Sequence, residues 1–446
     1  MKLAFLSLNY APEQIGIGPY SCMTAEMLAA AGHEVSVICG KPYYPEWRIA
    51  ESYRPGFYTT RREAGVRVTR CPHYVPARPG GVKRLLHHFT FALSAFCALL
   101  YQTARQRPDV ILATAPSLIA ALGGRVVAGL CGARFWLHVQ DFELEAAQAA
   151  GVLSKGFPGN RLVGMAESHF FRSADIVSSI SPQMCQRLAD KGVAQERIVE
   201  FPNWAEDDTI RPLSRNTDLR REWSLGDRTV VLYSGNIGRK QGLNIVLEAA
   251  RDLQHRQDLI FVICGEGPER TELERQAVGL DHCLIKPLQS RERLGELLAT
   301  ADIFILPQLA DAADLVLPSK LPNMMAAGRP VIATTEPGTG VYDEIRNVGI
   351  ATRPGDPVAL ARAIERLADN PALREDLGYR ARWKAISRWA RDGILKRFLC
   401  DFTRVANIPR SSRRKGRGAI VSLIFLTIGL TGFFSRLAWL LLAGNF

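Results

Sequence analysis

The chain has 446 residues, and because a single hydrophobic core stops growing at roughly 250 to 300 residues, a one-domain protein is excluded. Hydrophobic residues make up 47% of the chain, which is the composition of a globular protein. The net charge of +12 is uneven, and an arginine-rich tract at 410–417 leaves nucleic acid and an anionic membrane surface as alternative partners.

The nine cysteines do not suggest a metal site or a disulfide framework. Their number is odd, most lie in apolar segments, and neither a CxxC pair nor a Cys/His metal spacing occurs. We therefore expect reduced core residues of a cytosolic chain. The cysteines stand at positions 22, 39, 71, 97, 131, 185, 264, 283 and 400.

The first half of the chain alternates strand-like and helix-like segments. The apolar run 3–8 is too short for a signal-peptide core and suits a first buried strand. Further strands are expected at 34–39, 66–70, 110–113, 135–139 and 176–179, and helices at 21–31, 85–105, 118–131 and 162–173. Short apolar strands separated by helices predict a parallel, doubly wound sheet.

The same pattern restarts after Pro202-Asn203 and predicts a second α/β domain. Its strands are expected at 229–233, 259–264, 283–286, 303–306, 331–334 and 350–351. Two such domains would leave a cleft between the carboxyl ends of their sheets, where ligands of open α/β sheets bind. Helices are expected at 357–369 and 372–402, with Trp383 and Trp389 as packing anchors.

The end of the chain has a different composition. Residues 419–435 carry no charge over 17 positions, and a second apolar run, 437–443, follows Arg436. A helix of the uncharged part covers roughly 25 Å, which is at the short end for a membrane span. We expect a membrane-embedded segment, with a surface-packed helix or a re-entrant hairpin as the alternatives. The basic flank predicts a cytosolic catalytic body by the positive-inside bias.

Residues 85–101 are also unusually apolar, and they follow Arg78, Lys83 and Arg84. A helix of this kind can lie in the head-group region of a membrane with its cations on phosphates. A buried core helix of the first sheet is the alternative, and the sequence favours it slightly.

The stretch 229–250 predicts a phosphate-binding turn. A buried strand ends before Gly235, and the chain then passes the cations Arg239 and Lys240 before a helix begins at Gly242. Glycines let the backbone approach an anion, and the first N–H groups of a helix point at it. An ordinary βα turn with solvated cations explains the pattern as well.

A second anion site is predicted at 318–333. Ser319 and Lys320 open an expected helix at 321–327, so a hydroxyl, an ammonium and unpaired N–H groups meet at its start. Two such sites in one domain predict a diphosphate, with Lys240 and Lys320 converging on the same two phosphorus atoms.

Between these two sites the motif Gly265-Glu266-Gly267 follows a strand. A flat base could lie against such a backbone, although a plain turn explains the motif equally well.

The order of these motifs resembles a known enzyme family. SGNIGRKQGL, ICGEGPE, ADIFILP and PSKLPNMMAAGRPVIAT, in this order, are similar to the donor-binding domain of glycosyltransferase family 4, which groups retaining enzymes with two facing Rossmann-like domains, the GT-B fold. In the first half, the loop NYAP with Gly16 and Gly18, the segment at 174–181 and FPNW at 201–204 resemble further family motifs. The variants GNIGxKQGL and PSKL are most like the fucosyltransferases assigned to bacterial colanic-acid-type exopolysaccharide pathways.

The resemblance implies an α/β chain with the GT-B fold. The implied parts are an acceptor domain at 1–204, a nucleotide-sugar donor domain at 205–385, a helix at 386–409 covering the first domain, a basic linker at 410–418 and a hydrophobic membrane segment at 419–446. The implied location is the cytoplasmic face of the inner membrane, anchored by the last segment.

The resemblance also assigns candidate site residues. The implied donor-binding residues are Gly235, Asn236, Lys240, Gly265, Glu266, Gly267, Ser319, Lys320, Leu321 and Asn323, and the implied acceptor-side loop carries Gly16 and Gly18. The implied catalytic candidates are His138 and Asp141, although a histidine at a strand end is more often structural.

The chain departs from the family in three places. Asn236 stands where most members have an arginine, and Lys240 stands one place early. In the paired-glutamate motif, Leu315 and Asn323 replace the glutamates, so Asp311 or Asp314 could supply a sugar contact instead. Gln140, rather than a histidine, precedes Asp141.

The expected chemistry needs few side chains. In retaining transfer of the internal-return type the leaving diphosphate takes the acceptor proton, and the protein stabilises charge that grows on the β-phosphate. Paired cationic sites and no Asp-x-Asp motif predict an enzyme without a metal or other cofactor, for which the nucleotide sugar is a co-substrate.

We therefore expect a glycosyltransferase that moves a sugar, with fucose or mannose from a GDP donor as the candidates, onto a lipid-linked oligosaccharide at an anionic membrane surface. Nucleic acid is not expected as a partner. The alternatives are a nucleotide-sugar epimerase of the same fold and a non-catalytic scaffold that binds sugar nucleotides.

Overall fold

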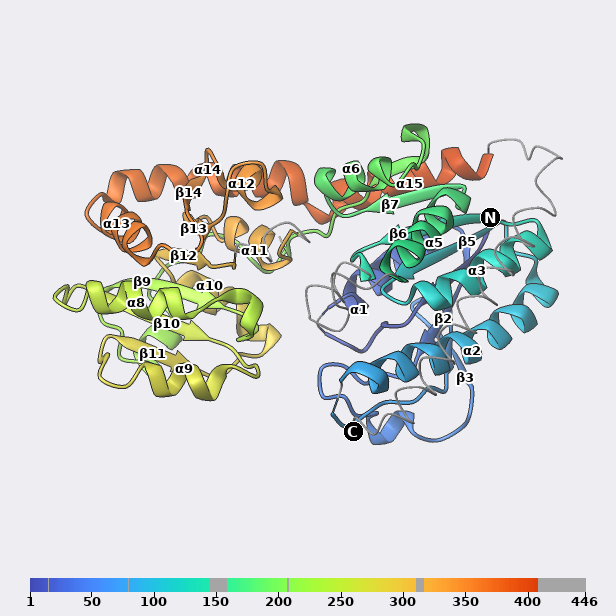
Figure 1. Cartoon of the computed structure of the whole chain (residues 1–446), viewed down its shortest axis with the longest axis horizontal. Coiled ribbons are helices and arrows are strands. Elements are labelled where there is room, and N and C mark those ends of the chain that lie inside the picture. Colours follow the sequence, from blue (N-terminus) through green and yellow to red (C-terminus); the bar gives the residue numbers. More distant parts are fainter. Residues whose placement is uncertain (15, 79, 144–158, 207, 310–316, 408–446) are drawn as a thin grey trace. The chain divides into compact units, whose positions relative to one another are not determined.

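The structure is a computed structural model that describes residues 1–14, 16–78, 80–143, 159–206, 208–309 and 317–407. These residues form two compact units, Met1–Phe201 together with the chain from Leu395 onward, and Pro202–Ile394 (Figure 1). Each unit is built around one sheet. The predicted basic linker and membrane segment, and the candidates Asp311, Asp314 and Leu315, lie outside the described residues.

The sheet of unit 1 has eight strands in the order β3-β4-β2-β1-β5-β6-β7-β8. The strands are β1 (Lys2–Ser7), β2 (Glu34–Gly40), β3 (Thr59–Glu63), β4 (Val66–Cys71), β5 (Val110–Ala115), β6 (Arg134–Val139), β7 (Ile176–Ser179) and β8 (Ile198–Glu200). Neighbouring strands pair in parallel, as predicted, except that β3 pairs antiparallel with β4. Strands β3 and β8 were not predicted, because β3 is polar and largely exposed, and β8 has only three residues.

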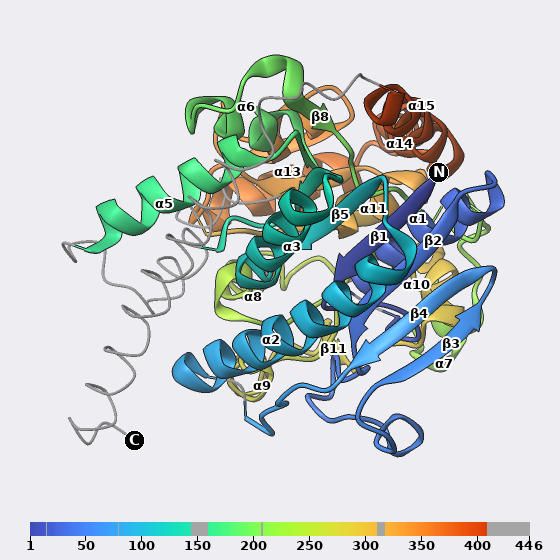
Figure 2. The ribbon, with the colours of Figure 1, turned by 90° about the vertical axis from the view of Figure 1, so that its right-hand side faces the viewer.

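Helices cover the sheet of unit 1. They are α1 (Gly18–Ala30), α2 (Gly81–Gln106), α3 (Leu118–Cys131), α5 (Gly159–Ser173), α6 (Pro182–Asp190) and α15 (Arg391–Asn407), with 3-10 turns η1 (Glu51–Tyr53) and η2 (Gln195–Arg197). The helices α2 and α3 pack side by side on one face (Figure 2). In α15, the Phe398 ring lies 5.1 Å from the ring of Trp136, between ring centroids, and so attaches the end of the described chain to β6.

Unit 2 has a parallel sheet of six strands in the order β11-β10-β9-β12-β13-β14. The strands are β9 (Thr229–Ser234), β10 (Leu259–Cys264), β11 (Cys283–Lys286), β12 (Ile303–Leu306), β13 (Val331–Thr334) and β14 (Gly349–Thr352). The helices are α7 (Asp218–Glu222), α8 (Asn244–Asp252), α9 (Arg270–Gln276), α10 (Leu294–Thr300), α11 (Lys320–Ala326), α12 (Gly340–Ile345), α13 (Pro357–Ala368) and α14 (Pro371–Trp389), with 3-10 turns η3 (Arg239–Gln241) and η4 (Arg291–Arg293). Strands β9, β10 and β12 are buried, which is why their apolar runs predicted them correctly.

The predicted helix at 372–402 is wrong, because it is two helices that break at Ala390. That residue has extended backbone and forms an isolated parallel bridge with Ala205. Trp389 is fully buried, whereas Trp383 is 66% exposed, so only one of the two predicted anchors packs. Six residues turn a helix by about 240°, so the two tryptophans cannot face the same neighbour.

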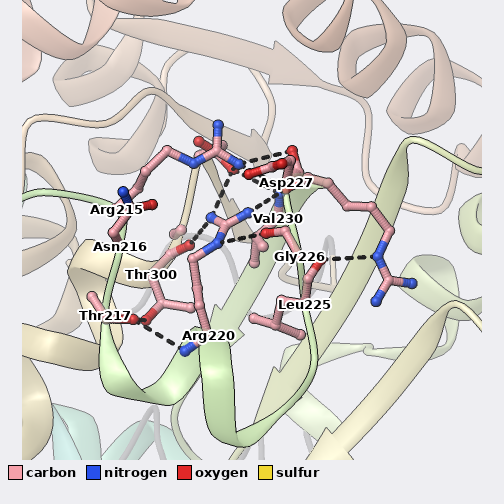
Figure 3. A network of polar contacts seen from close by, with 12 residues as sticks. Arg215, Asn216, Thr217, Arg220, Leu225, Gly226, Asp227, Val230 and Thr300 are labelled. Atoms are coloured by element: carbon pink, nitrogen blue, oxygen red, sulfur yellow. Dashed lines mark hydrogen bonds and ion pairs between the residues drawn. The ribbon is translucent and has the colours of Figure 1, made fainter.

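A buried polar network ties α7 to the amino ends of β9 and β12 (Figure 3). The Arg220 guanidinium donates to the backbone oxygen of Thr300 at 3.0 Å and to the Asp302 carboxylate at 3.3 Å. The same carboxylate accepts the backbone N–H of Val230 at 2.9 Å, and Arg215 lies 3.4 Å from it. This network stabilises the end of the sheet where β9 and β12 begin. The predicted donor residues lie at the other end, where the strands finish.

Candidate functional site

The predicted donor residues lie at the carboxyl ends of the unit 2 strands. Gly235 follows β9, Gly265 follows β10, and Lys320 opens α11, which leads into β13. Because β9 lies between β10 and β12 in a parallel sheet, these three segments meet at the carboxyl end of the sheet.

Lys320 is positioned by the end of β9. Its ammonium donates to the Tyr233 hydroxyl at 2.9 Å and lies 4.0 Å from the centroid of the Tyr233 ring. A Cβ atom at Gly235 would lie 2.7 Å from the ammonium, and Gly235 has a φ of 141°, a backbone conformation that favours glycine. Burial lowers the pKa of Lys320 to about 7, because desolvation disfavours the charged form.

The two glycine-rich loops of the donor site pack backbone against backbone. A Cβ atom at Gly265 would lie 1.9 Å from the Gly235 oxygen, and one at Gly267 would lie 2.2 Å from the Ile237 oxygen. Backbone hydrogen bonds join the same loops, from Gly235 to Cys264 at 3.0 Å and from Ile237 to the Glu266 oxygen at 2.8 Å. The Gly-x-Gly motif is therefore explained by the packing of the loops, whether or not a base also lies there.

Lys240 lies in the exposed turn η3, not directly at the start of α8, because Gly242 and Leu243 separate the two. Among the residues that the structure describes, its ammonium has no hydrogen bond or ion pair. The neighbouring loop residue Asn236 is exposed, and its backbone oxygen accepts the Tyr233 hydroxyl at 2.5 Å. The convergence of Lys240 and Lys320 on one diphosphate stays a prediction.

The other donor candidates have mixed surroundings. Ser319 is exposed and makes no side-chain cap to α11, so no described residue of this helix start occupies its hydroxyl. The Leu321 side chain is fully buried and its N–H donates to the Pro318 oxygen at 3.0 Å, which argues against a donor contact. The Asn323 carboxamide oxygen accepts the backbone N–H of Glu206 at 2.9 Å, so it has a structural partner.

Glu266 is likewise engaged, in an ion pair with Arg270. The Glu266 side chain is nevertheless half exposed. A ligand could therefore still compete for that carboxylate.

In unit 1 a buried carboxylate organises the predicted acceptor-side loop. Glu13 accepts the backbone N–H groups of Tyr43 and Tyr44, both at 3.0 Å, and the Asn9 carboxamide at 2.8 Å. Burial raises the pKa of Glu13, although these bonds favour the ionised form. Glu13 was not among the predicted site residues, and the signal available in the sequence was that it is the one charged residue of the stretch 9–18.

Both loop glycines have structural reasons to be glycine. Gly16 has a φ of 72°, in the left-handed region. A Cβ atom at Gly18, the first residue of α1, would lie 3.2 Å from the Glu13 oxygen.

His138 is buried in the core of unit 1. Its Nδ1 lies 2.9 Å from the Ser178 hydroxyl, which is also bonded to the Trp136 indole, and its ring lies 5.1 Å from that of Phe201. Burial lowers the pKa of His138 to about 3, because desolvation disfavours the charged ring. This placement favours the structural alternative for His138, whereas Asp141 is half-buried in the bend after β6.

A second missed carboxylate lies close to Asp141. Glu143 accepts the backbone N–H groups of Ser117 and Leu118, the latter at 2.7 Å, at the start of α3. Ser117 has a φ of 114°, an unusual conformation for a residue with a side chain, and such strain gathers at functional sites. The loops after β1, β5 and β6 meet at one edge of the sheet, because these strands are neighbours.

No group of three or more His, Cys, Asp or Glu side chains in the described part of the chain has the geometry to hold a metal ion. The nine cysteines are unpaired, and most are buried or half-buried, although Cys97 and Cys400 are exposed.

Comparisons with known proteins identify the family. Residues 16–204 match the family described as "Glycosyl transferase 4-like domain", and residues 215–384 match "Glycosyl transferases group 1". The colanic acid biosynthesis glycosyl transferase WcaI of Escherichia coli (strain K12) is 40% identical over 376 residues, which cover 82% of this chain and 92% of that protein.

Solved structures agree on the fold. Sucrose-phosphate synthase from Thermosynechococcus elongatus superposes with a TM-score of 0.71 at 18% identity, over 91% of this chain and 98% of that one. HepE from Anabaena, solved in complex with UDP, superposes with a TM-score of 0.65 at 15% identity, over 91% of this chain and all of that one. The chain therefore belongs to the glycosyl transferase 4-like and group 1 family, and it is a glycosyltransferase with the two-domain GT-B fold.

Proposed function

We propose that the enzyme transfers a sugar from a nucleotide-sugar donor onto a lipid-linked oligosaccharide during the assembly of a colanic-acid-like exopolysaccharide. The name of its relative WcaI supports the pathway class. Fucose or mannose carried on GDP are the proposed donors. The nucleotide sugar is a co-substrate, and the reaction needs no other cofactor and no metal ion.

The observation that carries the proposal is the position of Lys320. The Lys320 ammonium is half-buried beside Gly235, and among the described residues its only partner is the phenol of Tyr233, so the charge is poorly compensated. A diphosphate at the end of β9 would provide the missing anion and restore the charged form of the lysine. Such a preorganised cation stabilises the charge that develops on the leaving phosphate.

We propose retention of the anomeric configuration by internal return. The leaving β-phosphate oxygen takes the proton of the acceptor hydroxyl, the glycosidic bond to the phosphate breaks, and the bond to the acceptor oxygen forms on the same face. In this scheme the protein holds and neutralises the diphosphate, and no side chain has to become a covalent nucleophile. Asp141 is the proposed acceptor contact, and Asp311, Asp314 or Asn323 the proposed sugar contact.

We further propose that the enzyme works at the cytoplasmic face of the inner membrane, anchored by 419–446. The outer face of α2 supports this location, because Leu93 is 58% and Tyr101 is 61% exposed, and Lys83 and Arg84 precede them in the helix. Among the described residues, α2 is long and apolar enough to span a bilayer, but Phe91, Ala95 and Leu99 pack into unit 1. We therefore infer a helix that lies on the membrane surface rather than one that crosses it.

The test is a transfer assay with the purified full-length enzyme in membranes that contain the lipid-linked acceptor. Labelled GDP- and UDP-sugars are supplied in turn, and Lys320→Met serves as the matched control. Transfer of label into the lipid extract from one donor, lost in the control, supports the proposal. Interconversion of the donor without transfer would favour an epimerase, and binding without turnover would favour a scaffold.

A further inference from the structure

Unit 1 contains a cavity of about 390 Å³ that the donor chemistry does not use. It lies between the carboxyl-terminal half of α2 and the hairpin of β3 and β4, which run beside each other in Figure 2. One wall is formed by Cys97 and Tyr101 of α2, and the other by Thr60 and Thr69 of the hairpin. The hairpin is held to the helix by the Tyr58 hydroxyl, which donates to the Ser94 oxygen at 3.0 Å.

The walls of the cavity are mostly apolar. Tyr58, Ala98 and Tyr101 present ring and methyl surface to it. The hydroxyls of Thr60 and Thr69 lie 3.1 Å apart and satisfy each other. The middle of the cavity therefore suits hydrocarbon.

Two arginines, Arg67 and Arg105, add positive charge to the cavity. In the part of the chain that the structure describes, neither has a carboxylate partner, and the Arg105 guanidinium rests over the Tyr101 ring at 4.4 Å. Arg62 stands directly opposite Arg67 in the ladder, where like charges destabilise a strand pair. A bound anion would relieve this repulsion.

One residue that lines the same cavity carries a buried polar atom without a partner. Gln102 is 9% exposed, and its carboxamide oxygen has no hydrogen-bond partner among the described residues. An unpaired buried acceptor destabilises the fold. A ligand hydroxyl would satisfy it.

We propose that this cavity binds an anionic phospholipid whose head group carries a hydroxyl. The phosphate is held by Arg67 and Arg105, the first carbons of one acyl chain lie against Tyr58 and Tyr101, and the hydroxyl donates to Gln102. The same helix carries the exposed apolar face of Leu93 and Tyr101, so the lipid would be drawn from the surface on which α2 lies. The assignment does not depend on the identity of the sugar donor.

The test uses the exposed thiol of Cys97 as a reporter, with the exposed Cys400 of α15 as the internal control. Alkylation of each cysteine in the full-length protein is followed by peptide mass spectrometry. Short-chain dioctanoyl phosphatidylglycerol should slow alkylation of Cys97 about tenfold at ten times its dissociation constant, and should leave Cys400 unchanged.

Dioctanoyl phosphatidylcholine and inorganic phosphate are the comparison probes. Unchanged alkylation of Cys97 would overturn the proposal. Equal protection by phosphatidylcholine would overturn the anionic class, and equal protection by inorganic phosphate would overturn the lipid.

Two variants test the assignment of residues. The double variant Arg67→Ala, Arg105→Ala should abolish the protection of Cys97 by phosphatidylglycerol. The double variant Arg61→Ala, Arg161→Ala removes the same amount of charge elsewhere and should keep the protection. Arg61 is the matched control because it precedes Arg62 on β3, and Arg62 is paired with Arg67. Neighbouring residues of a strand lie on opposite faces of the sheet, so Arg61 lies on the face away from Arg67.

If the double arginine variant fails to fold, Ala98→Trp fills the cavity without a change of charge and should also abolish protection by phosphatidylglycerol. Donor binding, measured in parallel by thermal shift, should remain in every variant. Loss of donor binding alone would count against the proposed function and not against the lipid site.

Discussion

The ammonium of Lys320 lies against Tyr233, 2.9 Å from its hydroxyl oxygen and 4.0 Å from the centre of its ring. The Tyr233 hydroxyl in turn donates to the backbone oxygen of Asn236. The end of β9, the glycine loop and the start of α11 are thus linked through one phenol. A ring face is a weak partner for a cation compared with a phosphate, so the arrangement favours an incoming anion.

Replacing Lys320 with methionine should raise the dissociation constant of the nucleotide sugar about 10- to 100-fold, since a hydrogen bond to a charged group contributes about 1.5–3 kcal/mol. Lys240→Met should have a similar effect if both ammonium groups contact the diphosphate. Titration calorimetry measures the change, with the exposed Arg211→Gln as the charge-matched control. Unchanged affinity in both lysine variants would contradict the proposed donor site.

Donor binding should weaken as the pH rises above 7. Burial lowers the pKa of Lys320 to about 7, so above this pH the free enzyme carries a mostly neutral amine. A bound diphosphate favours the ammonium and raises its pKa, so binding at pH 8 should take up close to one proton. Calorimetry in two buffers of different ionisation enthalpy measures this uptake, which should vanish in Lys320→Met.

Gly265→Ala should disrupt the donor site. Its Cβ atom would lie 1.9 Å from the Gly235 oxygen, a backbone atom that cannot rotate away, so one loop has to move. We expect a loss of about 1–3 kcal/mol in the free energy of unfolding, together with weaker donor binding. Gly81→Ala, which meets no atom within 4 Å, is the control, and equal urea midpoints for the two variants would refute the close packing of the loops.

Arg220→Met should lower the free energy of unfolding by about 3–5 kcal/mol, because it leaves the Asp302 carboxylate buried beside fewer cations. A second change, Asp302→Asn, should recover part of the loss. Arg256→Met removes an arginine whose carboxylate partners are exposed, and it should change stability by less than about 1 kcal/mol. Denaturant unfolding measures the free energy of unfolding of each variant and so compares the buried ion pair with the exposed ones.

His138→Asn should affect stability more than turnover. If the imidazole is structural, the free energy of unfolding falls by about 1–2 kcal/mol and kcat changes by only a few-fold. A direct acid–base role would instead reduce kcat by about 100-fold or more.

The pH dependence of stability gives a second readout for His138. The pKa is about 3 in the fold but near 6.5 in the unfolded chain, so the unfolded state binds more protons between these values. Stability is therefore lost as the pH falls below about 6.5. The variant lacks this component, so the component should appear as the pH-dependent difference in stability between the parent and the variant.

Local patterns were sufficient to predict most strands of the two sheets and to group the candidate donor residues. Strands such as β10 are buried on both faces, so they appear in the sequence as unbroken apolar runs, and helix periodicity fills the intervals. Parallel strands place their carboxyl ends at the same end of a sheet, so the sequence alone predicts that the loops at Gly235 and Gly265 lie near the start of α11. The edge strand β3 left no such pattern, because its residues are polar and exposed.

Contacts between distant residues were decided only by the tertiary structure. Tyr233 lies 87 positions from Lys320, and Glu13 lies 30 positions from the amide of Tyr43. His138 has the same strand-end pattern as a catalytic histidine, yet Ser178 and Phe201 enclose it. Hydropathy along the chain reports whether a residue is buried, but the partner of a buried polar group is set by which segments the packing brings together, and this has no local pattern in the sequence.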